Sequence, residues 1–244
     1  MRSGNPSLRG NTFDAYAGMG GGHVMTIQGT VNKTFILLLL IIASAGFTWF
    51  QYFSGVNIVP HLVIGVIGVL ILSLVTVFWK KAAPVTAPMY AIFEGLFVGG
   101  ISGLYESEFQ GITITAVTLT FAILIGLLMV YKSGLIKVTH NFRLGVAAAT
   151  LGIFLAYLTS FILGLFGITV PFIHDATPIG ILISVGIVII AALNLVLDFD
   201  FIEKGAAIGC PKYMEWYGAF GLMVTLVWLY LEILRLLAKI NSRK

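Results

Sequence analysis

The sequence contains no Lys, Arg, Asp or Glu between Lys33 and Lys80. A soluble domain rarely keeps so long a stretch free of charge, because its surface needs polar cover. A helix needs roughly 20 mostly apolar residues to cross about 30 Å of hydrocarbon, so this stretch is long enough for two membrane spans. Turn-forming residues between Ser54 and Pro60 stand where the chain is expected to reverse.

Charge is scarce throughout the chain, and cysteine is almost absent. Only 10% of the 244 residues are charged and 59% are hydrophobic, with a mean hydropathy of +1.02. The one cysteine, Cys210, excludes an intrachain disulfide and a site built from several thiolates. The net charge of +4 comes from cations scattered in short loops and at the tail, so we interpret them as topology signals and expect no nucleic-acid partner.

Seven hydrophobic runs predict seven transmembrane helices, because a lone strand would leave its backbone groups unpaired in lipid. They are expected at Thr34–Phe53, Val59–Trp79, Ala83–Tyr105, Gly111–Tyr131, Leu144–Val170, Pro178–Leu197 and Trp216–Leu237. The predicted fold class is therefore an all-α integral membrane protein, a polytopic bundle of about seven helices in contact with the lipid bilayer. We divide the chain into a flexible polar tail (1–33), the transmembrane domain (34–238) and a basic tail (239–244).

Cations gather in alternate loops, which orients the predicted bundle. The loops rich in Lys and Arg precede the first run and follow the second, fourth and sixth, whereas the other loops carry acids or histidine. The positive-inside rule then places the N-terminus in the cytoplasm. The last run leaves a conflict, since a full span would export Arg235 and Lys239, whereas a re-entrant segment would keep them inside. We favour seven spans and leave the side of the C-terminus open.

Glu94 stands near the middle of the third run, about 17 Å of helix from either end. An acid at that depth costs several kcal/mol unless it is protonated, paired or hydrated, so it is a candidate functional residue. The structural alternative is a protonated glutamate that bonds to a neighbouring helix. Gly95, Gly99 and Gly103 follow it at four-residue spacing, which predicts close packing against a second helix.

Three further acids stand at or inside the last two runs. Asp198 and Asp200 end the sixth run, and their hard oxygen ligands suit Ca²⁺ or protons better than Zn²⁺. Two residues apart, they should not share a helical face. The structural alternative is a solvated helix end, which we prefer for Glu203. Glu232 stands deep in the last run, three residues before Arg235, a spacing that permits an intrahelical ion pair.

Three segments together resemble the Bax inhibitor family, also called the transmembrane Bax-inhibitor-motif family, and in particular its bacterial YccA-like branch. They are Ala87-Pro-Met-Tyr-Ala-Ile-Phe-Glu-Gly-Leu-Phe-Val-Gly-Gly-Ile-Ser-Gly, Leu197-Asp-Phe-Asp-Phe-Ile-Glu, and Glu215-Trp-Tyr with Trp228-Leu-Tyr-Leu-Glu-Ile-Leu-Arg-Leu-Leu. The resemblance implies a seven-helix bundle whose last helix is surrounded by the others, and a pH-sensitive leak of Ca²⁺. It also implies a bacterial plasma (inner) membrane as the location.

In the better-known branch of that family, an aspartate late in the sixth helix shares a proton with a second aspartate in the last helix. Asp198 matches the first position. Alignment on Ile-Leu-Arg puts Thr225 at the second, whereas alignment on Leu-Tyr-Leu followed by an acid puts Glu232 there. Two close carboxylates in low dielectric cannot both ionise freely, so such a pair titrates as a unit.

Two rival functions come from other classes. Gly100-Ile-Ser-Gly matches the Gly-x-Ser-Gly signature of rhomboid proteases, and Ser102 could meet His61 or His174. A scaffold or regulator of other membrane proteins is the third reading. The sequence favours a non-enzymatic, calcium-permeable channel without a cofactor, gated by protons. Its expected sensor and ion-path residues are Asp198, Asp200, Glu94 and Glu232, of which Asp198 and Asp200 could bind calcium.

Overall fold

A computed structural model describes residues 24–167 and 175–243 of the chain. Its long helices are α1 (Ile27–Phe53), α2 (Val59–Phe78), α3 (Ala83–Glu108), α4 (Ile112–Lys132), α5 (His140–Leu165), α7 (Pro178–Ile208) and α8 (Met214–Asn241), with a short 3-10 turn η3 (Lys80–Ala82) before α3. All seven long helices are long and apolar enough to cross a membrane. Within the described residues this confirms the predicted all-α polytopic bundle.

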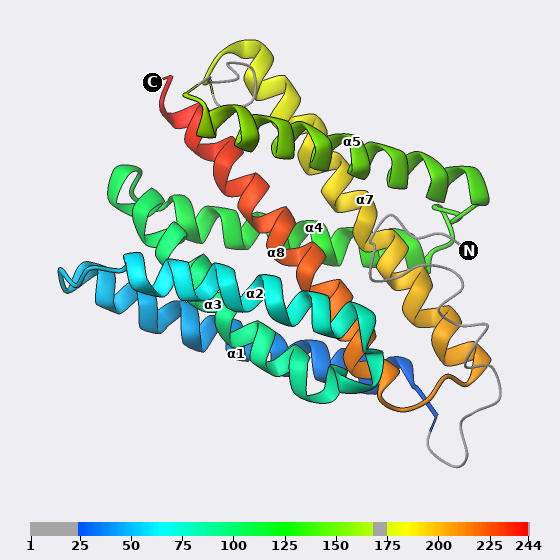
Figure 1. The fold of residues 1–244 in the computed structure, drawn as a ribbon. Coiled ribbons are helices and arrows are strands. Elements are labelled where there is room, and N and C mark those ends of the chain that lie inside the picture. The colour runs from blue at the N-terminus through cyan, green and yellow to red at the C-terminus, as the bar shows by residue number, and fades with distance from the viewer. Residues whose placement is uncertain (1–23, 168–174, 244) are drawn as a thin grey trace.

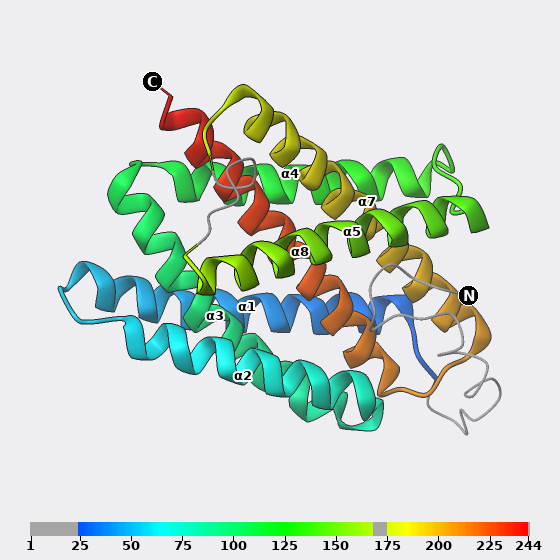
Figure 2. The ribbon, with the colours of Figure 1, turned by 45° about the horizontal axis from the view of Figure 1, so that its top comes forward.

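Helix α8 forms the centre of the bundle. Of its most apolar stretch, 67% is buried inside the protein, against 11% for α2 and for α5. It packs against α1, α3, α4 and α7, whereas α5 packs mainly on α7 at the periphery. Figures 1 and 2 show α8, in orange and red, passing diagonally between the other helices. The family resemblance therefore predicted the central position of the last helix correctly.

The same helix runs from one end of the bundle to the other (Figure 1). Its 28 residues extend about 42 Å, enough for a complete span, and the re-entrant alternative is not observed. Arg235 and Lys239, near the end of α8, consequently lie at the opposite end of the bundle from Lys33, which contacts the start of α8.

Most helix ends lie within five residues of the predicted ones, and two differ by more. Helix α1 begins at Ile27 rather than at Thr34, because Thr26 caps it by accepting a bond from the Gly29 N–H. The preceding tail, residues 1–23, and Val170 lie outside the described residues. Helix α7 continues past Leu197 to Ile208 and ends where Gly209 adopts a left-handed conformation (φ 74°). Charged residues after Leu197 did not interrupt the helix; the glycine did.

The glycines of α3 bring its backbone against α1, as their spacing predicts. A Cβ atom at Gly99 would lie 2.2 Å from the Ala45 carbonyl oxygen, and one at Gly95 would lie 1.8 Å from Ser44 Oγ. At Gly103 it would approach the Tyr52 ring at 2.9 Å. Only a residue without a side chain permits this approach. The three glycines are therefore packing residues.

Candidate functional site

Asp198 is the most deeply enclosed of the predicted acids. Its relative exposure is 0%, and its neighbours in sequence, Leu195 to Phe199, are all buried. Since α7 continues to Ile208, Asp198 lies ten residues inside the helix rather than at its end. The solvated helix end that we considered for this residue is therefore not observed.

The depth of Asp198 can be compared with that of residues on α8, because α7 and α8 are consecutive and antiparallel. Thr225 lies eleven residues after the start of α8, which puts it nearly level with Asp198. Glu232 lies seven residues further, about 10 Å along the axis. By this count Thr225, rather than Glu232, lies at about the depth of Asp198. Thr225 is buried and donates its hydroxyl to the Gly221 carbonyl at 3.2 Å.

Glu94 lies on the buried face of α3, with a relative exposure of 6%. One turn earlier on the same face is Tyr90, whose ring packs edge-on against Phe220 of α8 at 4.9 Å between centroids. Because α3 packs directly on α8, the carboxyl group lies inside the bundle rather than toward lipid. Its placement inside the bundle agrees with the prediction of an acid enclosed within a spanning helix.

Asp200 forms a network with two cations. Arg143 Nη2 of α5 lies 2.8 Å from its Oδ2, and Lys204 Nζ lies 2.6 Å from its Oδ1. The Asp200 side chain is 14% exposed, whereas Asp198 is completely buried. The two acids therefore face different surroundings, as their spacing along the helix predicted. Nearby Glu203 is exposed, as we expected, and it accepts a hydrogen bond from the Tyr131 hydroxyl.

Glu232 belongs to a polar cluster near the far end of α8. Tyr157 of α5 donates its hydroxyl to the carboxylate at 2.9 Å, and the Trp228 indole N–H donates at 3.2 Å. Arg235 lies 3.3 Å from the carboxylate, which is the predicted intrahelical pair, and its guanidinium also lies 4.9 Å from the Tyr157 ring centroid. These contacts link α8 to α5.

The four predicted acids thus occupy three distinct environments rather than one cluster. Asp200 and Glu232 each pair with cations at different depths, and Asp198 and Glu94 lie in the core on different helices. Among residues 24–167 and 175–243, no group of three or more His, Cys, Asp or Glu is arranged to hold a metal ion. The calcium-ligand role suggested for Asp198 and Asp200 gains no support from this arrangement.

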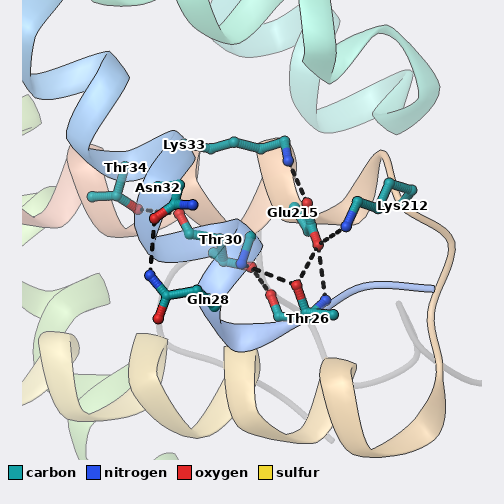
Figure 3. A network of polar contacts seen from close by, with 9 residues as sticks. Thr26, Gln28, Thr30, Asn32, Lys33, Thr34, Lys212 and Glu215 are labelled. Carbon is teal, nitrogen blue, oxygen red and sulfur yellow. Dashed lines mark hydrogen bonds and ion pairs between the residues drawn. The ribbon is translucent and has the colours of Figure 1, made fainter. Parts of the chain in front are cut away.

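A fifth acid, Glu215, was missed as a site residue. It lies in the first turn of α8, yet its side chain has no exposure. Lys33 of α1 and Lys212 both form ion pairs with it, the latter at 2.8 Å. Figure 3 shows the carboxylate between these two lysines and Thr26. An acid at a helix start normally faces solvent, and only the neighbouring Lys212 hinted in sequence at a pair.

Thr26 completes the surroundings of Glu215. Its backbone N–H and its hydroxyl both donate to Oε1, at 2.9 and 2.8 Å. A Cβ atom at Gly29 would lie 2.1 Å from the same oxygen, so glycine leaves the space that the carboxylate fills. The Met25 N–H also donates to the Cys210 carbonyl at 2.6 Å. The start of α1 and the start of α8 are therefore joined by one network, which we call the Glu215 latch.

Ser102 has a structural partner in the bundle. Its hydroxyl lies 2.6 Å from the Tyr230 hydroxyl of α8, and both side chains are buried. His61 of α2 contacts the Phe47 ring in a tilted arrangement, with ring centroids 5.8 Å apart. His174 lies outside the described residues. The hydroxyl–hydroxyl contact accounts for Ser102 as part of the α3–α8 interface.

The comparison with protein families agrees with the resemblance to the Bax inhibitor family and does not extend to its bacterial YccA-like branch. The family model described as Bax inhibitor 1 like matches residues 5–242, nearly the whole chain. No match was found among the curated proteins or among the solved structures. The match covers all seven spanning helices and the acids described above. The chain therefore belongs to the Bax inhibitor family.

Proposed function

We propose that this protein is a pH-regulated, calcium-permeable leak channel, and not an enzyme, in which protonation of Asp198 controls the packing of α7 on α8. The observation that carries the proposal is the complete enclosure of a carboxyl group deep inside α7, where that helix meets the central helix. A group so placed cannot change its charge without changing the energy of the surrounding packing.

The physical argument follows from the cost of a buried charge. An ionised carboxylate in the membrane interior costs several kcal/mol unless water or a counter-charge reaches it, whereas the protonated acid is neutral. Protonation therefore favours the enclosed arrangement described here, and loss of the proton favours a looser one that admits water. With no exposed surface on Asp198, a Ca²⁺ ion can reach it only after α7 and α8 separate.

The other acids receive different roles under this proposal. Glu94 lies in the core on α3, which packs on α8 as α7 does. It would line the ion path when the helices separate. An anionic constriction of this kind attracts divalent cations. Asp200, paired with Arg143, would hold α7 to α5 in the closed bundle. Glu232, bonded to Tyr157, would hold α8 to α5.

We place the protein in the bacterial inner membrane with its N-terminus in the cytoplasm. The support is the alternation of cationic loops, which the helix order preserves: Lys80, Lys132 and Lys204 fall at one end of the bundle. With Cys210 replaced by serine, a cysteine introduced in the Lys132–Arg143 connection should react with a membrane-impermeant thiol reagent only after the cells are opened. Reaction in intact cells would show that this connection faces the outside and that the proposed orientation is wrong.

The decisive experiment measures Ca²⁺ flux into proteoliposomes across a range of pH. Asp198→Asn mimics the protonated state at nearly constant volume, so it should flatten the pH dependence. Asp175→Asn is the matched control, because Asp175 is exposed before α7 and the chemical change is the same. An unaltered pH profile in Asp198→Asn would refute the role of Asp198 as the pH sensor. Absence of flux from the folded wild type would favour the scaffold function instead.

A further inference from the structure

A cavity of about 300 Å³ lies among α1, α3, α4 and α8. Helix α1 contributes residues from Leu38 to Trp49, and α4 contributes residues from Thr113 to Phe121. The back wall is Leu226, Val227 and Tyr230 of the central helix. The lining on α1, from Leu38 to Trp49, extends about 16 Å along the helix axis.

The cavity opens sideways, toward the hydrocarbon of the bilayer. Ile42 and Phe121, at its margin on α1 and α4, are 59% and 37% exposed, and in a seven-span protein such apolar surface meets lipid chains. The back wall on α8 is buried, with Leu226 and Val227 at 3% and 6%. A molecule that touches the back wall has therefore entered between α1 and α4 and is not merely lying on the outer surface.

The few hydroxyl groups near the cavity already have partners. Ser102 and Tyr230 pair with each other at 2.6 Å, the Thr113 hydroxyl donates to the Ser102 carbonyl at 3.3 Å, and the Thr120 hydroxyl donates to the Ala116 carbonyl at 2.7 Å. Water needs two to four polar partners to occupy a cavity, and an apolar cavity without them stays dry. An empty space would also leave its lining without dispersion contacts.

We propose that one acyl chain of a membrane phospholipid occupies this cavity, lying between α1 and α4 against α8. The site is continuous with the lipid-facing surface of the protein, its lining is mainly apolar, and the 16 Å that it covers along α1 gives room for an extended chain. The chain fills the void beside the central helix and couples α8 to the surrounding lipid.

The test uses the full chain in liposomes that contain a phosphatidylglycerol with a diazirine in the middle of one acyl chain. After illumination, labelled residues are mapped by mass spectrometry of peptides. We expect labelling within residues 226–230, which outer-surface lipids cannot reach. The blocking variant is Gly46→Phe, because Gly46 lines the cavity and a Cβ atom there meets nothing within 4 Å. Labelling of 226–230 should fall at least tenfold.

Gly152→Phe on α5 is the matched control, since a Cβ atom there also meets nothing within 4 Å and the site is far from the cavity lining. It should leave the labelling unchanged. Both variants are compared at equal thermal stability, and Gly46→Leu replaces Gly46→Phe if the larger ring unfolds the protein. The proposal is overturned if wild-type residues 226–230 stay unlabelled, if the folded Gly46 variant is labelled as strongly as the wild type, or if only a photoactivatable free fatty acid labels them.

Discussion

Replacing Lys33 with Met should loosen the end of the bundle where α1 and α8 begin. The Glu215 carboxylate has no exposure, and of its two cations Lys33 is the more enclosed, with 17% side-chain exposure against 50% for Lys212. Lys33 also lies over the Trp216 ring, 5.5 Å from its centroid. Methionine preserves the apolar stem on that ring and removes only the charge.

The magnitude follows from what remains around Glu215. Breaking a buried pair by removing one partner costs about 3–5 kcal/mol. Here Lys212 and two bonds from Thr26 still support the carboxylate, so we expect about 2–3 kcal/mol for Lys33→Met. Lys212→Met should cost about 0–1 kcal/mol, the range of exposed pairs. The equilibrium for opening should rise about 30- to 150-fold for Lys33→Met.

Cys210 provides the assay for this opening. It is the only cysteine, it is buried in the α7–α8 connection, and its carbonyl holds Met25 beside the latch. The rate at which a thiol-reactive fluorophore labels Cys210 therefore reports how often this end opens. Burial raises the pKa of the Cys210 thiol, so little thiolate forms in the closed state at neutral pH, and labelling should accelerate as the pH is raised.

The two lysine variants are expected to differ in the rate at which Cys210 is labelled. Measured at one pH, Lys33→Met should label far faster than the wild type and Lys212→Met only slightly faster. Equal rates for the two variants would show that the burial of a lysine does not determine how much its ion pair with Glu215 stabilises the closed state. A wild-type rate in Lys33→Met would show that the Glu215 latch does not hold α1 to α8.

Three other outcomes are expected. Gly99→Val should lower the thermal unfolding temperature in detergent strongly, because its Cβ would collide with the backbone of α1, whereas Gly152→Val should be neutral; equal melting of both would contradict the close approach. Ser102→Ala should leave ion flux intact, and a serine-directed fluorophosphonate should not label wild-type Ser102; covalent labelling would support the protease reading. Asp198→Asn should flatten the pH dependence of flux and Glu232→Gln should not, since about 10 Å of helix separates their depths. A flattened profile in Glu232→Gln, with a double variant no worse than either single change, would mean that the two acids share a proton.

Much of the fold was determined by the local sequence. Apolar runs of about 20 residues must be helices in lipid, because their backbone groups have no other partners, and this predicted all seven spans. The four-residue spacing of Gly95, Gly99 and Gly103 puts them on one helix face, and this predicted a close helix contact. The spacing did not predict that α1 would be the partner. The helix ends were less predictable, since they depend on the single residues Thr26 and Gly209.

The environment of each acid was decided only by the tertiary structure. Lipid is as apolar as the protein core, so a spanning helix can be hydrophobic on all sides and its sequence does not reveal which face turns inward. Asp200 meets Arg143 across 57 residues, Glu232 meets Tyr157 across 75, and Glu215 meets Lys33 across 182. Such pairs depend on which helices become neighbours and how each is rotated. The sequence therefore identified acids that lie within the membrane, and the packing around α8 determined which are enclosed, which are paired, and that Thr225 rather than Glu232 lies level with Asp198.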